Sequence, residues 1–81
     1  MKELRLCIVS PEKKVYDGNV RSVTLPGTLG SFTILPQHAP IVSSLQEGKL
    51  SYVTEEGEEK VLDIQSGFVE MSDGIASVCI S

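Results

Sequence analysis

The chain has 81 residues, of which 41% are hydrophobic and 22% charged, and its formal net charge is −4. This length and composition are typical of one small folded domain rather than a disordered segment, so we expect a single domain over residues 1–81. The negative charge argues against nucleic acid as a partner, because phosphate binding requires a basic surface. No run of about 18 apolar residues is found, so we expect no direct insertion in a membrane. The N-terminus lacks the apolar core of a signal peptide, which favours the cytosol.

Apolar and polar residues alternate along most of the chain, which is the period of β-strands with one covered face. In the first segment, residues 3–9, this alternation predicts that Leu4, Leu6 and Ile8 point to one side. The sequence SPEK at residues 10–13 predicts a turn, because its proline presets the backbone.

Several further short strands are expected before the middle of the chain. KVYDG at residues 14–18 is predicted to be a strand that ends in a turn at its Asp-Gly pair. NVRSVTLPG at 19–27 is predicted to be the next strand, and its Pro-Gly pair ends it. SFTIL at 31–35 and PIVSSLQEG at 40–48 are β-patterned in the same way.

The second half of the chain has the pattern of two hairpins. One is predicted around Glu56-Gly57 and the other around Asp73-Gly74, each between two β-patterned arms. Apolar residues nowhere recur at helical spacing over three turns with a cap, so no helix is predicted. The sequence therefore predicts an all-β fold: a flattened sandwich or barrel of about ten short, mostly antiparallel strands, with no C-terminal helical domain.

Cys7 and Cys79 are the two cysteines of the chain, and each lies in an apolar run. Two thiols alone cannot complete a four-ligand zinc site. They could form a disulfide or a redox pair, or pack separately as small buried thiols. We favour packed thiols, because thiols of cytosolic proteins stay reduced.

His38 is the one histidine of the sequence and lies between Pro36 and Pro40. Nucleophilic catalysis requires a nucleophile, a base and an orienting group, and the sequence shows no motif that unites them. The loop GTLGS lacks the lysine and the helix of a phosphate-binding loop. We therefore expect no enzyme activity, no cofactor and no metal site. Four glutamates lie around the first hairpin turn, where a solvated loop is the simplest interpretation: Glu55, Glu56, Glu58 and Glu59.

Two interpretations of His38 remain open from the residues alone. In the first, the imidazole packs between strands and hydrogen-bonds a backbone group at a crossover between the sheets. In the second, the loop is an exposed ledge that contacts a partner. The flanking prolines suit both, because they order the loop before any contact is made.

One long stretch is similar to a known family pattern: GTLGSFTILPQHAPIVSSLQEGKL, with its Leu-Pro-x-His-Ala-Pro core. It resembles the N-terminal domain of the epsilon subunit of bacterial F-type ATP synthases, which is equivalent to the mitochondrial delta subunit. The opening LCIVSPEKKVYDGNVRSVTLPG and the closing DIQSGFVEMSDGIASV are also similar to that family, so the resemblance covers essentially the whole chain.

The resemblance implies a flattened β-sandwich and a non-catalytic role in the rotating central stalk. In the family, this domain binds the gamma subunit by an apolar face and rests on the polar loops of the membrane rotor ring, the c-ring. It couples proton-driven rotation to ATP synthesis at the cytoplasmic face of the bacterial inner membrane, as a peripheral subunit. Carried over by position, the ring-side contacts are Leu29, Gly30, Ser31 and His38. The gamma-side contacts are Ser10, Val42 and Ser43.

Two departures from the family pattern bear on function. Ser31 stands where an acidic residue is common and Thr33 where glycine is common, so charge pairing with a basic ring loop is expected to be weaker. Many members continue into a C-terminal helical hairpin that inhibits ATP hydrolysis and in some members binds ATP. We expect a naturally short form rather than a truncated one. The alternative function is a generic β-sandwich adaptor that binds a protein or peptide at an exposed sheet edge.

Overall fold

The computed structural model describes residues 3–81, which form eight strands and no helix. Accordingly, this part of the chain contains no helix that is long and apolar enough to cross a membrane. The strands are β1 (Leu4–Val9), β2 (Lys14–Gly27), β3 (Gly30–Ile34), β4 (Ile41–Leu45), β5 (Gly48–Thr54), β6 (Glu59–Ile64), β7 (Gly67–Ser72) and β8 (Ile75–Ile80).

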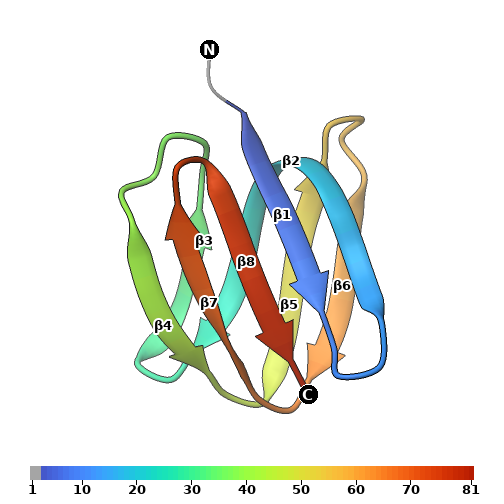
Figure 1. Ribbon diagram of the computed structural model, residues 1–81, viewed down its shortest axis with the longest axis vertical. Helices are drawn as coiled ribbons and strands as arrows, with labels where there is room; N and C mark the ends of the chain where they lie inside the picture. The colour runs from blue at the N-terminus through green and yellow to red at the C-terminus, as the bar shows by residue number, and fades with distance from the viewer. Residues whose placement is uncertain (1–2) are drawn as a thin grey trace.

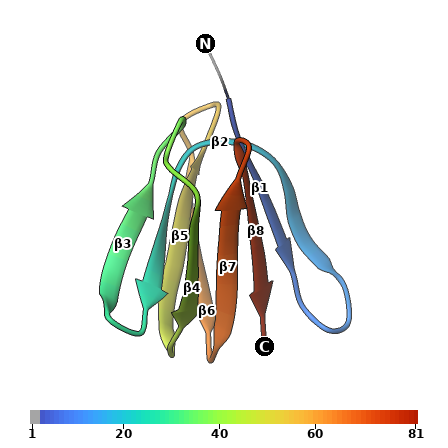
Figure 2. The same ribbon diagram turned by 60° about the vertical axis from the view of Figure 1, so that its left-hand side comes forward.

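The strands form two layers that share β2 (Figures 1 and 2). In one layer, β4, β7, β8 and β1 lie side by side, and β1 also pairs with the first half of β2. In the other, β3 and β5 flank the second half of β2, and β6 pairs with β5. The β1–β8 pair is parallel and the other pairs are antiparallel. The predicted all-β sandwich is therefore confirmed.

The predicted turn at Asp17-Gly18 is wrong, and it accounts for part of the difference between eight strands and about ten. Both residues lie inside β2, where Asp17 pairs with Cys7 and Gly18 with Leu6 of β1. An Asp-Gly pair signals a turn locally, but here the partner strand fixes an extended backbone. β2 changes partners at an irregularity between Val20 and Ser22 instead.

The core lies between the two layers and follows the predicted alternation. Leu4, Leu6 and Ile8 are completely buried, as predicted for the first strand. The largest other side chains of the core are Leu25, Ile34, Leu50 and Met71, with Val23, Val69 and Val78 beside them. Burial of these residues is the main favourable term that holds so small a sandwich together.

The two predicted hairpins are confirmed, and their turns lie at one end of the molecule. The β7–β8 turn has Asp73 at φ 52° and Gly74 at φ 78°, which suits the tight turn that favours Asp-Gly. The β5–β6 turn, the 35–40 loop and the start of β1 lie at this same end, which we call the His38 end (Figure 1). The β2–β3 turn, the 10–13 turn and the C-terminus lie at the opposite end, which we call the Leu29 end (Figure 1).

Candidate partner-binding surfaces

The expected ring-side residues lie at the two ends of β3 rather than in one cluster. Leu29 is fully exposed in the β2–β3 turn, at 102%, and Gly30 and Ser31 begin β3 beside it. His38 lies in the loop beyond the other end of this strand. A strand of five residues spans about 16 Å. One partner surface can contact all four residues only if it runs along β3.

The outer edge of β3 is available for such a contact. Among residues 3–81, β3 pairs with β2 and with no other strand. Ser31 and Thr33 are exposed on β3, and the Thr33 hydroxyl lies 2.9 Å from that of Thr24 on β2. The edge thus offers free backbone groups and small polar side chains between Leu29 and His38, which we call the β3 edge.

His38 is exposed, so the interpretation in which it packs between strands is wrong in this structure. Its backbone N–H donates to the carbonyl of Leu35 at 3.1 Å, and its Nδ1 lies 2.7 Å from the carbonyl oxygen of Ala39. A carbonyl oxygen can only accept, so Nδ1 is the donor in this hydrogen bond. The hydrogen bond from the imidazole to a backbone group was expected and is present, but it orders an exposed loop rather than a packed crossover.

The expected gamma-side residues do not share one face. Val42 is 75% exposed on the outer face of β4, whereas Ser43, the next residue, is half-buried opposite the buried Val69. Neighbouring strand residues point to opposite faces, so Val42 and Ser43 cannot contact the same flat partner surface. Ser10 follows β1 at the Leu29 end, where its hydroxyl and backbone bind Lys13.

Val42 shares the outer side of the β4–β7–β8–β1 layer with other apolar residues, although Glu70 lies directly opposite it on β7. Phe68 is 51% exposed there and pairs with Cys79 of β8, which in turn pairs with Val9 of β1. We call Val9, Val42, Phe68 and Cys79 the Phe68 face. Phe68 was not singled out from the sequence. A signal was present, because two adjacent apolar residues in a β-strand point to opposite faces, so one of them is left on the outer face.

The two cysteines are free and half-buried, rather than fully buried as expected. Cys7 lies opposite Ser77, and Cys79 lies opposite Val9. The two thiols are therefore on the same side of adjacent strands, displaced by two residues along them. Cys79 thereby belongs to the Phe68 face. Cys7 lies toward its margin.

An ion-pair network borders this face on the side of β2. Arg5 contacts the Asp17 carboxylate at 2.8 Å, and Lys14 contacts it at 3.1 Å. The hydrogen bond from Arg5, followed by that from Lys14, lowers the pKa of Asp17 below its ordinary value of 3.8. Asp17 is thus already committed to two cations, and it lies in the half of β2 that pairs with β1 rather than in the half that pairs with β3.

Comparison with known proteins identifies the family. Residues 3–81 match the family described as ATP synthase, Delta/Epsilon chain, beta-sandwich domain. The ATP synthase epsilon chain of Leptospira interrogans is 44% identical over 77 residues, which are 94% of this chain and 59% of that one. The chain thus spans about 59% of the length of such relatives. The epsilon chain of Caulobacter vibrioides is 39% identical over 71 residues, covering 88% of this chain and 81% of its own.

Solved structures agree in fold. A chain of the Euglena gracilis mitochondrial ATP synthase structure, which contains OSCP, F1 and the c-ring, matches with a TM-score of 0.91 at 21% identity, over 99% of this chain and 51% of that one. A chain of the Tetrahymena thermophila central stalk and c-ring structure matches with a TM-score of 0.79 at 18% identity, over 99% and 66%. At these identities the likeness shows the fold alone. The sequence matches establish that the chain belongs to the ATP synthase delta/epsilon chain family and contains its β-sandwich domain.

Proposed function

We propose that this chain is a non-catalytic subunit of the central stalk of an F-type ATP synthase. The observation that carries the proposal is the family match over residues 3–81, together with a relative of similar length that is named ATP synthase epsilon chain. In this role the domain binds the gamma subunit and the c-ring. It passes the rotation of the ring to the catalytic head and performs no chemistry itself.

The Phe68 face is our proposed gamma contact. Val42 and Phe68 are apolar side chains that remain exposed on the same side of one layer, as diagonal neighbours on β4 and β7. Exposed apolar clusters of this kind are typical of protein interfaces, because docking removes them from water. Ser10 lies directly after Val9 of this face, whereas Ser43 points to its inner side and would act only by supporting β4.

The β3 edge is our proposed ring contact. Leu29 and His38 are exposed at its two ends, and Gly30 and Ser31 lie between them. This surface lies on different strands from the Phe68 face, so the domain can bind both partners at once. In a bacterial cell, such a subunit belongs to a membrane-associated complex and lies at the cytoplasmic face of the inner membrane.

Binding of the purified domain to purified gamma and to isolated c-ring tests this function. We expect binding to gamma at micromolar concentrations or tighter, because interfaces of ordinary size bury about 1,600 Å². Val42→Asp should abolish gamma binding and leave c-ring binding intact, and Leu29→Asp should do the reverse. Absence of gamma binding at micromolar concentrations by a folded domain would refute the proposal.

The open edge of β3 supports a second candidate, an adaptor that adds a peptide strand to its sheet. The two candidates differ in what the edge recognises. Strand addition uses backbone hydrogen bonds along the whole of β3 and tolerates many side chains. A central-stalk subunit should instead discriminate its own c-ring from unrelated extended peptides in a competition assay.

A further inference from the structure

A hollow of about 400 Å³ lies at the His38 end, between the 35–40 loop and the β7–β8 turn. Its walls are formed by Gln37, His38, Pro40, Asp73 and Gly74. The two walls come from segments that are distant in the sequence. The sandwich therefore assembles a site that no local motif encodes.

Both walls of this hollow are held in place. The Gly74 carbonyl accepts a hydrogen bond from the backbone N–H of Arg5 at 2.9 Å, which ties the turn to β1. The loop is held by the His38 hydrogen bonds already described and by its two prolines. Rigid walls lose little entropy when a ligand group enters.

Residues with a left-handed backbone lie on both walls of the hollow. Among residues 3–81, Gln37 at φ 69° and Asp73 at φ 52° are the non-glycine residues with positive φ, and both line the hollow. Aspartate is common in this conformation, but glutamine is not, and it costs on the order of 1 kcal/mol. Gln37 thus holds a strained backbone conformation beside the hollow, which points to a function for this loop.

Within the described residues, the lining of the hollow carries one carboxylate and no lysine or arginine. The Asp73 carboxylate brings a negative charge, and His38 contributes a planar ring whose Nδ1 is already bonded to the Ala39 carbonyl oxygen. The Gln37 amide can accept through its oxygen or donate through its NH2 group. Pro40 contributes an apolar wall. These groups suit a flat cation with several N–H donors better than an anion.

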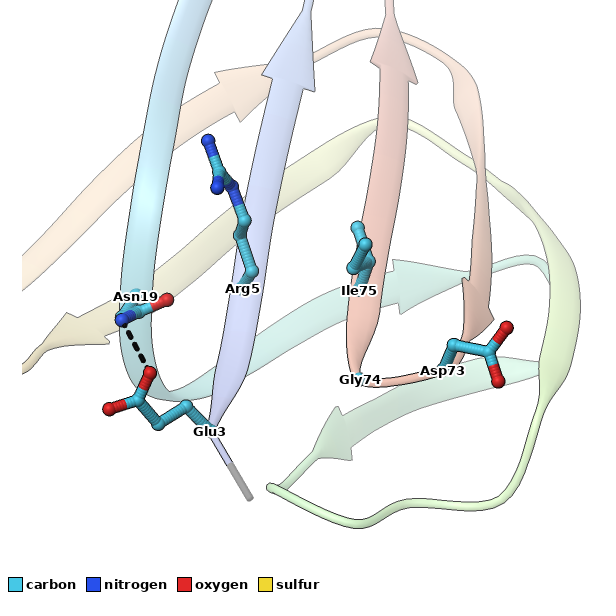
Figure 3. Close-up of a pocket in the computed structure, with 6 residues that line it drawn as sticks. All are labelled: Glu3, Arg5, Asn19, Asp73, Gly74 and Ile75. Carbon is cyan, nitrogen blue, oxygen red and sulfur yellow. Dashed lines mark hydrogen bonds between the residues drawn. The ribbon is translucent and has the colours of Figure 1, made fainter.

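Asp73 has no ion pair with any basic side chain in the described part of the chain. An adjoining hollow of about 470 Å³ shares Asp73 and contains Arg5 and Glu3. Figure 3 shows the Asp73 carboxylate directed away from both of these residues. Arg5 is bound to Asp17, and Glu3 accepts a hydrogen bond from the Asn19 amide at 3.0 Å. The negative charge of Asp73 is thus left for an outside partner.

We propose that this hollow binds the guanidinium group of an arginine side chain presented by a protein partner. Guanidinium is planar, is always charged and donates in a fixed fork that a carboxylate matches, and its face stacks on flat apolar surfaces. The inference rests on the proposed function, because the hollow lies at the His38 end of the β3 edge, the proposed ring contact. It states which chemical group that partner presents there. Asp73 then supplies the acidic group that Ser31 does not.

A titration of the isotopically labelled domain with N-acetyl-arginine amide, followed by amide NMR shifts, tests the site without any partner protein. We expect weak binding with shifts centred on Gln37, His38, Asp73 and Gly74. Asp73→Asn keeps the turn, since asparagine also suits positive φ, and should weaken binding about 3- to 10-fold. Glu56→Gln removes the same charge from another turn at this end and should leave binding unchanged.

N-acetyl-citrulline amide, which is neutral and nearly isosteric, should cause no localised shifts, and N-acetyl-lysine amide should bind more weakly than the arginine probe. Equal shifts with the citrulline probe, or equal affinity for the domain and its Asp73→Asn variant, would overturn the guanidinium site. If such a domain still bound the c-ring, the proposed function would stand without this site. If arginine bound as expected but the c-ring did not, the site would stand and its assigned partner would be wrong.

Discussion

Truncating the Phe68 face should weaken gamma binding by an amount that follows from the exposed side chains. Full burial of a valine or phenylalanine side chain is worth about 1.5–3 kcal/mol. Val42 is 75% exposed and Phe68 is 51% exposed. Docking can therefore still gain about three-quarters of the burial free energy at Val42 and about half of it at Phe68. Val42→Ala and Phe68→Ala should each cost about 1 kcal/mol of binding free energy, or roughly fivefold in Kd.

Calorimetric titration of gamma with each purified variant measures this effect. The matched control is Val61→Ala, because Val61 is 53% exposed but lies on β6 in the other layer. Val42→Ala should unfold within about 0.5 kcal/mol of the unsubstituted domain, and Phe68→Ala and Val61→Ala, whose side chains are about half-buried, should each lose about 1 kcal/mol and remain folded in the assay. A change in Kd can then be assigned to the interface rather than to folding.

Two results would refute this reasoning. If Val61→Ala weakened gamma binding as much as Val42→Ala, the binding surface would lie on the other layer or extend over both. If Val42→Ala and Phe68→Ala together left Kd unchanged, the exposed apolar face would not be the gamma contact. The double variant also tests coupling, because the two residues lie on adjacent paired strands, β4 and β7.

Three further predictions concern the fold and its charges. Gln37→Gly should raise the free energy of unfolding by a few tenths to about 1 kcal/mol in urea titrations, because glycine relieves the strained φ of 69°. Gly67→Ala should cost more than about 2 kcal/mol in the same assay, since its Cβ would overlap a β8 carbonyl, whereas Gly30→Ala meets no atom within 4 Å and should cost less. The hydrogen bond from Arg5 lowers the pKa of Asp17 in the folded state, so this group stabilises the fold above its unfolded pKa and loses that contribution as the pH falls through the folded value. Unfolding measured between pH 5 and 3 should therefore show a smaller acid-induced loss of stability for Asp17→Asn than for the unsubstituted domain.

Local patterns in the sequence were sufficient for the strand faces and the hairpins. The alternation of Leu4, Leu6 and Ile8 and the Asp73-Gly74 turn each depend on neighbouring residues, and both predictions are confirmed. The turn predicted at Asp17 failed because the decisive interactions come from β1, across the ladder. Pairing over such a distance is not encoded in a short window of sequence.

The candidate surfaces could be predicted less well than the fold. The Leu-Pro-x-His-Ala-Pro motif located the loop, but not the exposure of His38 or its distance from Leu29 along β3. The opposite orientations of Val42 and Ser43 follow from strand alternation and were accessible from the sequence. The approach of Asp73 to the 35–40 loop was not, because it depends on how β7 and β4 pair.

The sharing of β2 between the layers connects the two proposed partner contacts within one small domain. Its first half pairs with β1, which contributes Val9 to the proposed gamma contact, and its second half pairs with β3, which forms the proposed ring contact. A load applied at β3 therefore reaches β1 through one continuous strand and its hydrogen-bond ladders, without crossing a flexible linker. The irregularity between Val20 and Ser22, where β2 changes layers, is the point at which that path bends. Stiffness there, rather than any catalytic group, is what the proposed coupling role requires of this domain.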